Sequence, residues 1–312
     1  MRVYLTGACG QVGSHVAEML LERGDEVFGI DNLATGRKEH LPAHPRLKLL
    51  IDTIAERDVV VSTIEAFKPD VIVHTAASYK EPNDYYNDTL TNCVGAANLL
   101  AAAKQHRVGR LIYFQTALCY GVKPLHQPIR LDHPKLPANS SYAISKTAAE
   151  DYIEISGLDY VTFRLANVIG PRNVSGPLPI FFQRLSEGKR CFVTKARRDF
   201  VFVKDLARCV LKAVDGKGRG AYHFSSGTDV AIRELYDAVV AAMQPPAYPE
   251  PEVRDLGPDD APSILLDPTR TFADFGAIKF SPLGETVARA VEYYQQFGVT
   301  GGYTHLAHAE RT

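Results

Sequence analysis

Near its start the chain reads Val3-Tyr4-Leu5-Thr6-Gly7-Ala8-Cys9-Gly10-Gln11-Val12-Gly13, an apolar run followed by a glycine-rich turn. The spacing G-x-x-G-x-x-G lies between a predicted strand and the first predicted helix, where a dinucleotide-binding loop belongs. Glycines there allow a tight turn and a close approach to a pyrophosphate, and the helix N-terminus supplies N–H donors. A purely structural turn is the alternative interpretation.

The acidic residue Asp31 favours dinucleotide binding over a structural turn. It ends the second predicted strand, at about the 20-residue offset where an acid receives the adenosine ribose hydroxyls. A carboxylate at this position repels a 2′-phosphate. The sequence therefore predicts NAD as the cofactor in preference to NADP.

Outward from this loop, short apolar runs alternate with amphipathic stretches through the first half of the chain. Strand–helix–strand repetition implies parallel pairing, so we expect a doubly wound, Rossmann-type α/β sheet. After Asn167 prolines become frequent, yet apolar helical runs lie between them, which favours a smaller lobe over a linker. We expect a NAD-binding domain at 1–166 to which some later segments return, a mainly substrate-binding lobe at 167–300 and a polar tail at 301–312. The expected elements are strands at Val3–Leu5, Glu26–Ile30, Leu47–Ile51, Val71–His74, Leu111–Phe114 and Tyr160–Arg164, and a helix at Ser141–Ile155.

Composition excludes several classes of protein. The 312 residues include 35 Lys and Arg against 36 Asp and Glu, and the formal charge of −1 argues against nucleic-acid or membrane-surface binding. The five cysteines are scattered, which fits a reduced protein and predicts neither a disulfide framework nor a metal site. No apolar run approaches the roughly 20 residues of a membrane span, and no signal peptide is evident. We therefore expect a cytoplasmic protein.

Tyr142 and Lys146 stand at positions i and i+4 of the helix expected at Ser141–Ile155, so their side chains face the same side. An ammonium beside a phenol favours the phenolate, which would lower the tyrosine pKa toward that of a general base. Alone, such a pair is more often a surface feature than a site. Its position after the fifth strand of a dinucleotide-binding fold favours catalysis.

Further motifs follow in the order found in a known family: Gly7, Gly10 and Gly13; Asp31-Asn32; Asp52; residues 74–77; residues 92–95; residues 115–121; Tyr142 with Lys146 and Glu150; residues 164–172; residues 198–203; and residues 267–270. As a set they resemble the extended short-chain dehydrogenase/reductases, specifically the NAD-dependent nucleotide-sugar epimerases and dehydratases. The nearest likeness is to bacterial UDP-sugar 4-epimerases of the UDP-galactose and UDP-glucuronate type.

The resemblance implies roles for individual residues. Tyr142 would be the general base, Lys146 would hold the nicotinamide ribose, and Thr116 would hydrogen-bond the reacting oxygen. Asn167, Arg198 and Arg254 match positions that bind the nucleotide diphosphate. Positions that match cofactor contacts are Gly7, Gly10, Gln11, Val12, Gly13, Asp31, Asn32, Asp52, Thr53, Ala76, Lys80 and Asn92, together with Tyr142 and Lys146.

The resemblance also separates the reactions of the family, which share oxidation at sugar C4 by hydride transfer to bound NAD. A 4,6-dehydratase needs an Asp-Glu pair directly after the Thr, and a decarboxylase needs a Glu in the same segment, whereas this chain has Ala117-Leu118. Cys119 is one residue out of register with the cysteine of the 3,5-epimerase/reductases. A 4-epimerase needs only the three catalytic residues and is the favoured function. Another 4-oxidising enzyme of the family (a dehydratase, a decarboxylase or a reductase) and a non-catalytic NAD-sensing relative are the alternatives.

The identity of the UDP-sugar stays open between glucose/galactose and glucuronate/galacturonate, with the uronate preferred. Arg172 and the basic residues between 189 and 198 supply more cations than one diphosphate needs, and an arginine can bind a carboxylate through two hydrogen bonds. Solvated loop charges are an equal alternative for several of them. The resemblance further implies a homodimer built on the helices around 83–105 and 141–155.

Overall fold

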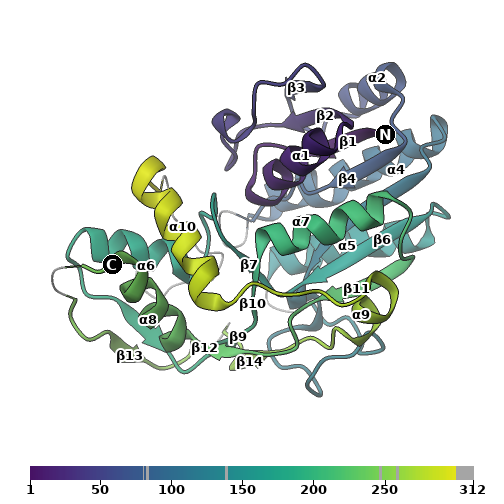
Figure 1. Ribbon diagram of the computed structural model, residues 1–312. Coiled ribbons are helices and arrows are strands. Elements are labelled where there is room, and N and C mark those ends of the chain that lie inside the picture. The colour runs from purple at the N-terminus through teal and green to yellow at the C-terminus, as the bar shows by residue number, and fades with distance from the viewer. Residues whose placement is uncertain (80, 82–83, 138–139, 246–247, 258–259, 300–312) are drawn as a thin grey trace.

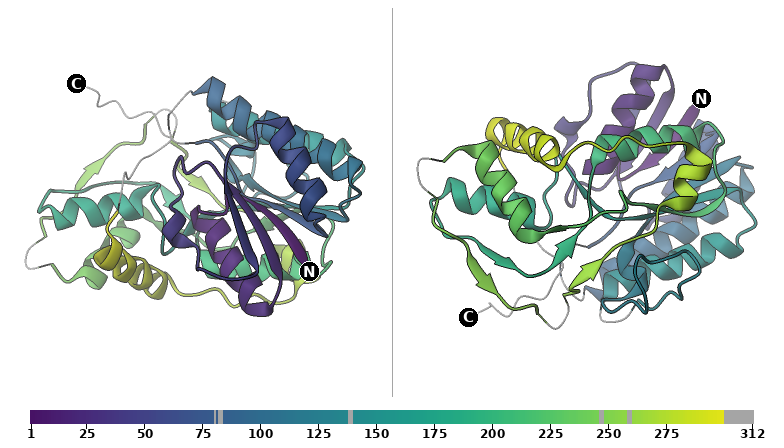
Figure 2. Two further views of the ribbon diagram at one scale, coloured as in Figure 1. Left: turned by 90° about the horizontal axis from the view of Figure 1, so that it is seen from above. Right: turned by 60° about the horizontal axis from the view of Figure 1, so that its bottom comes forward.

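The computed structural model describes residues 1–79, 81, 84–137, 140–245, 248–257 and 260–299. These residues form a parallel sheet with helices on both faces and a smaller lobe beside it (Figure 1). Two further views show the same two parts side by side (Figure 2). The expected doubly wound α/β fold is confirmed. Among the described residues, no helix combines the length and the apolar character that crossing a bilayer requires.

The central sheet has seven strands in the order β3-β2-β1-β4-β5-β6-β11, and every neighbouring pair is parallel. Its inner strands are continuous apolar runs, as a sheet buried on both faces requires. The order reverses between β1 and β4, and α/β proteins bind ligands beyond the carboxyl ends of the strands at such a point. The strands are β1 Arg2–Thr6, β2 Glu26–Asp31, β3 Leu47–Ile51, β4 Val71–His74, β5 Arg110–Thr116, β6 Tyr160–Leu165 and β11 Gly220–Phe224.

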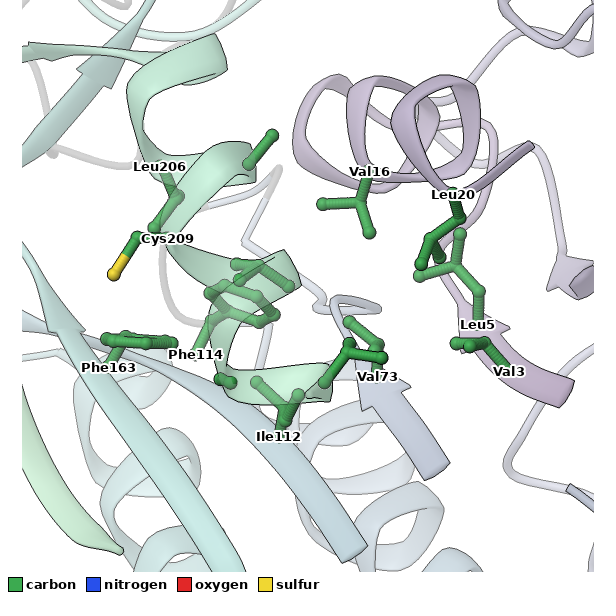
Figure 3. Close-up of a cluster of buried hydrophobic side chains, with 14 of the residues drawn as sticks. Val3, Leu5, Val16, Leu20, Val73, Ile112, Phe114, Phe163, Leu206 and Cys209 are labelled. Carbon is green, nitrogen blue, oxygen red and sulfur yellow. The ribbon is translucent and has the colours of Figure 1, made fainter. Parts of the chain in front are cut away.

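Helices cover both faces of this sheet. On one face, Val16 and Leu20 of α1 and Leu206 of α7 pack over Leu5 and Ile112 of the strands (Figure 3). On the other face, α2, α4 and α5 bury a second apolar cluster. The elements of this part are α1 Gln11–Arg23, η1 Lys38–His40, α2 Arg57–Phe67, α3 Tyr85–Asp88, the π-helix η2 Thr89–Val94, α4 Gly95–Gln105, η3 Ala117–Tyr120, α5 Ser141–Ile155, α7 Val203–Val214 and α9 Thr269–Phe275.

The smaller lobe is built mainly from residues that follow β6. Its helices α6, α8 and α10 pack around a third apolar cluster. Short strand pairs join them: β10 with β7, β9 with β12 and β14, and β13 with β8. The elements are β7 Asn167–Ile169, α6 Pro177–Ser186, β8 Phe192–Thr194, β9 Arg197–Arg198, β10 Phe200–Phe202, β12 Val230–Ala231, α8 Ile232–Met243, β13 Glu252–Arg254, β14 Ser263–Ile264 and α10 Leu283–Phe297.

Each of the six expected strands lies within an observed one, and the helix expected at Ser141–Ile155 has those bounds. The sequence missed β11, which pairs with β6 and returns to the sheet together with α7. The proposed boundary at 166 falls between β6 and β7, and the division into domains stays a prediction. The proposed tail at 301–312 lies outside the described residues.

Candidate active site

A cleft of about 610 Å³ lies at the carboxyl ends of the central strands and is lined by both parts of the molecule. It brings together most residues that the sequence singles out, although contact with a ligand stays a prediction for each of them. The predicted site residues that line it are Gly7, Gly10, Gln11, Val12, Gly13, Asp31, Asn32, Asp52, Thr53, Ala76, Thr116, Tyr142, Lys146 and Asn167.

The glycine loop is shaped by close backbone contacts. Gly7 has φ +64°, and a Cβ on it would lie 2.6 Å from the backbone nitrogen of Ala76. A Cβ on Gly13 would lie 2.1 Å from the carbonyl oxygen of Gly7. No side chain caps α1 at Gly10, and within the described chain the buried Gln11 Nε2 has no hydrogen-bond partner. This loop fits a pyrophosphate, because its glycines let the ligand approach the backbone closely. The uncapped N–H groups of α1 and the buried Gln11 donor would then be free to bind it.

The carboxylates at the ends of β2 and β3 fit the adenosine side of a dinucleotide. Asp31 Oδ2 accepts from the Cys9 backbone N–H at 2.8 Å, and Oδ1 accepts from that of Leu33 at 2.8 Å. Burial raises the pKa of Asp31, while these two hydrogen bonds oppose the shift. Asp52 accepts from the Thr53 backbone N–H at 2.8 Å. The two carboxylates fit the ribose hydroxyls of NAD and would repel a 2′-phosphate.

Three elements position the predicted catalytic residues. Thr116 ends β5, and its Oγ1 accepts from the Leu118 backbone N–H at 3.2 Å as η3 begins. Tyr142 and Lys146 lie in the first turns of α5, which Ser140 caps through its hydroxyl. The Lys146 ammonium is buried above a tyrosine ring of β5, 4.0 Å from its centroid.

In the structure the pKa of Tyr142 is raised, whereas the sequence predicts a lowered pKa. Burial raises it, and the neighbouring Tyr79 and Asp88 add to the shift. The Lys146 ammonium lies over the Tyr113 ring. Burial also lowers the pKa of Lys146 to about 7, with Glu150 acting in the opposite direction. The phenol of the ligand-free protein is therefore protonated at neutral pH, in contrast to the lowered pKa that its spacing from Lys146 predicts.

Asn92 does not line the cleft. It is buried within the π-helix η2, where its Oδ1 accepts from the Ser78 backbone N–H at 2.9 Å. Its Nδ2 donates to the Ser78 carbonyl at 3.0 Å and to the Ser145 hydroxyl at 2.9 Å. A cofactor contact was predicted here, yet Asn92 connects the cleft-lining segment after β4 to α5. The predicted contact of Lys80 lies outside the described residues.

The three predicted substrate arginines are engaged elsewhere and are not among the lining residues. Arg172 pairs with Glu18 of α1 and donates to the Ser14 hydroxyl at 3.0 Å. Arg198 pairs with Asp260. Arg254 lies with its guanidinium 4.3 Å above the Phe192 ring and donates to Glu252 at 3.0 Å. Among the described lining residues, Lys146 is the sole cation.

Several residues that line the cleft are not predicted from the sequence. The Tyr79 ring lies 5.7 Å from that of Tyr142, centroid to centroid. The Pro- and Gly-rich stretch after Ile169 was identified only as a loop, although such loops between two parts of a fold commonly carry binding residues. The residues concerned are Ser78, Tyr79, Glu81, Asp84, Asn87, Asn173, Ser175, Gly176, Pro177 and Phe200.

The segment after Thr116 carries no acid–base group. Ala117 and Cys119 are buried in an apolar cluster, and Leu118 packs against it. Burial raises the pKa of the Cys119 thiol. A buried thiol with a raised pKa is a poor acid–base group at neutral pH. This segment therefore lacks the acid–base residues that the resemblance assigns to the dehydratases and decarboxylases.

Comparison with known proteins places these features in a family. The sequence model of the NAD dependent epimerase/dehydratase family matches residues 3–224. The UDP-glucose 4-epimerase of Mycolicibacterium smegmatis is 31% identical over 314 residues, covering 95% of this chain and 99% of the relative. The structure of the Bordetella bronchiseptica enzyme WbmH in complex with NAD+ is 72% identical, with a TM-score of 0.94 and coverage of 96% and 99%. That of WbmG from the same organism, in complex with NAD and UDP, is 38% identical, with a TM-score of 0.90 and coverage of 98% and 99%.

The family match spans the glycine loop, the Tyr142–Lys146 helix and β11, and therefore covers the whole parallel sheet. The expected NAD dependence agrees with the description of that family. The chain belongs to the NAD dependent epimerase/dehydratase family.

Proposed function

We propose that this protein is an NAD-dependent 4-epimerase of a UDP-sugar. The observation that carries the proposal is one cleft that holds the glycine loop together with Thr116, Tyr142 and Lys146, followed by an apolar η3. The arrangement supplies the groups for reversible oxidation at a sugar carbon, and the segment directly after Thr116 lacks the acidic pair that the family's dehydratases use for elimination. The epimerase of Mycolicibacterium smegmatis, similar along nearly its whole length, supports this assignment.

In this reaction the sugar loses and regains one hydrogen at C4. Bound NAD would supply the hydride acceptor and, in its oxidised form, a positively charged nicotinamide ring. Loss of the Tyr142 phenol proton to solvent would be favoured by the positive charge of oxidised NAD. The phenolate would then take the proton of the 4-hydroxyl, while Thr116 hydrogen-bonds the same oxygen. After the 4-keto sugar has turned its other face, Tyr142 returns the proton. No net redox change or group loss occurs.

The nucleotide is proposed to be UDP. The similarity to WbmG, whose structure holds NAD and UDP, supports this assignment. Asn167 lines the cleft on the side of the smaller lobe. Arg198, whose side chain is 14% exposed, could bind a diphosphate if it exchanged its partner Asp260.

The proposal includes two candidate substrates that differ in the C6 substituent of the sugar, a UDP-hexose and a UDP-hexuronate. The preference for the uronate rests on Arg172 and on the basic residues between 189 and 198. The Arg172 guanidinium pairs with Glu18 and donates to Ser14. A carboxylate at C6 would have to compete with that ion pair. The direct test incubates the protein, without added NAD, with UDP-glucose and UDP-glucuronate separately and quantifies C4 epimers. Epimer formation from either sugar supports the proposal, whereas release of water or CO₂, or no turnover of either sugar, contradicts it.

A further inference from the structure

We propose that Gln115 is a positioning residue, whose buried side-chain amide holds Thr116 and the Lys146 turn of α5 at a fixed spacing. The inference rests on the proposed function, because this spacing sets the rate only if these residues act on a sugar. Gln115 adjoins Thr116 in sequence and lines the cleft.

The direction of Gln115 follows from the pleat of β5. Leu111 and Tyr113 belong to the apolar cluster under α5, whereas Ile112 and Phe114 belong to the cluster under α1 and α7. Alternation by two therefore turns Gln115 toward α5, and the side chain is 1% exposed. A buried amide at a position that otherwise carries apolar side chains needs hydrogen-bond partners.

Those partners come from both sides of the active site. Gln115 Oε1 accepts from the Thr116 backbone N–H at 2.8 Å. Its Nε2 donates to the Lys146 carbonyl at 3.1 Å and to Glu150 Oε2 at 3.0 Å. Chemistry fixes this orientation, since a carboxylate only accepts and a backbone N–H only donates. One side chain thus joins the end of β5 to two successive turns of α5.

The far end of this bridge is anchored in the interior. Glu150 Oε1 accepts from Arg164 Nε at 2.9 Å, and Arg164 also donates to the Tyr120 hydroxyl at 2.6 Å. That hydroxyl lies 2.6 Å from His223 Nε2. All four side chains are buried. Movement of Glu150 would break the 2.9 Å hydrogen bond and ion pair with the buried Arg164, so the carboxylate is a firm support for Gln115.

The near end controls catalytic geometry. The Lys146 carbonyl accepts from the Tyr113 hydroxyl at 3.0 Å as well as from Gln115, so two side chains of β5 fix this turn. Tyr142 lies one turn earlier on the same helix. A displacement of about 1 Å between reacting groups can cost roughly 100-fold in rate. Losing the bridge would therefore slow the chemical step more than it would weaken sugar binding.

The first test is Gln115→Met, which keeps the volume of the side chain and removes its polar atoms. We expect kcat to fall about 10- to 100-fold while KM stays within about threefold. The matched control is Gln183→Met on α6, which removes a donor to the Val299 carbonyl outside the cleft and leaves kcat unchanged. A folded Gln115→Met enzyme with wild-type kcat, or one changed in KM alone, overturns the proposal.

The second test is Gln115→Glu, which keeps an acceptor for the Thr116 N–H but places a carboxylate against Glu150. In a buried site two adjacent carboxylates repel each other, which raises the pKa of one of them, so that one takes up a proton as pH falls. A protonated carboxyl can again donate to Glu150. We expect kcat of this variant to rise toward the wild-type value as pH is lowered, and a pH–rate profile parallel to that of the wild type contradicts the bridge.

A readout independent of turnover separates this inference from the proposed function. Hydrogen exchange of the peptide containing Thr116 is measured on the NAD-bound protein for the wild type and for Gln115→Met. The Thr116 amide should lose protection in the variant, while peptides of α6 stay unchanged. Unaltered protection of Thr116 overturns the inference even if epimerisation is found. Lost protection together with no turnover of any UDP-sugar supports the bridge and refutes the proposed function.

Discussion

On α5 the Tyr142 phenol and the Lys146 ammonium lie one turn apart but respond to different surroundings. Burial favours the neutral form of both, which raises the pKa of Tyr142 and lowers that of Lys146. For Tyr142 the nearby Tyr79 and Asp88 add to the effect. Without ligands the Tyr142 phenol is protonated. Its spacing from Lys146 in the sequence therefore does not by itself make Tyr142 a base.

Replacement of Tyr142 tests its role as the proton acceptor. Tyr142→Phe should lower kcat by roughly 10²–10⁴-fold, because a general acid–base group is lost, while NAD and UDP-sugar binding persist. Steady-state kinetics and calorimetric titration measure the two effects. Tyr248→Phe is the control, since Tyr248 is 53% exposed and does not line the cleft. Wild-type turnover by Tyr142→Phe would remove Tyr142 from the mechanism.

Lys146 should also affect stability as a function of pH. Its pKa falls from 10.5 to about 7 on folding, so above pH 7 the unfolded chain binds more protons than the folded one. The free energy of unfolding of the cofactor-free protein should therefore rise with pH above about 7, by at most about 1.4 kcal/mol per pH unit for this one group. Denaturant unfolding of the wild type and of Lys146→Met checks this. The free energy of unfolding of the wild type relative to the variant should rise as pH increases from about 7 to 10.5. Parallel curves would contradict the lowered pKa of the buried lysine.

At the scale of elements, the sequence predicts those strands and helices whose positions depend on the local pattern of residues. The inner strands are apolar runs between turns, and the helix at Ser141–Ile155 begins after a capping serine, so both were located correctly. β11 was missed because its pairing with β6 depends on residues far apart in the chain. The π-helix η2, in which Asn92 is buried, has no signal in the local sequence pattern.

The sequence likewise does not predict which charged side chains pair with one another. Arg172 has the residue type and the position expected of a carboxylate ligand, but its φ of +66° and its ion pair with Glu18 place it against α1. Arg198 meets Asp260, which is distant in sequence. By contrast, the glycine loop and Asp31 were predictable, because their roles depend on spacing within one strand–turn–helix unit.

The pair Arg172–Glu18 couples α1 to the loop that enters α6, and it yields a prediction at this scale. Glu18→Gln and Arg172→Met should each raise KM for the nucleotide sugar by a similar factor, roughly 3- to 10-fold, and the double variant should be no worse than either. Kinetics of the three variants with both sugars provide the test. If Arg172 instead binds a sugar carboxylate, Arg172→Met alone would impair the uronate and Glu18→Gln would not.

At the scale of the whole molecule, α3 and α5 expose apolar side chains. Tyr85 and Tyr86 of α3 and Ile144, Tyr152 and Ile155 of α5 are each at least half exposed, with Ile155 at 81%. Exposed apolar groups gathered on packed helices are typical of an interface between proteins. The homodimer expected on helices around 83–105 and 141–155 stays a prediction that this surface favours.

A single charge on this surface should disrupt the dimer. Ile155→Glu would bury a carboxylate in the interface and should convert the protein to a monomer at micromolar concentration, as measured by light scattering. Ile51→Glu, at the edge strand β3, introduces the same charge on another exposed isoleucine and should leave the dimer intact. A wild-type monomer would refute the predicted assembly.

The central claim is that one hydrogen leaves C4 of a UDP-sugar and returns to its other face within the same cleft. The most direct measurement uses UDP-glucose and UDP-glucuronate labelled with deuterium at C4, incubated with the purified protein without added cofactor. Mass spectrometry and NMR then identify the C4 epimer and the position of the label. We predict that one of the two sugars yields its C4 epimer with the deuterium retained at C4. Absence of an epimer from both sugars, or an epimer that has lost the label to solvent, would contradict the account.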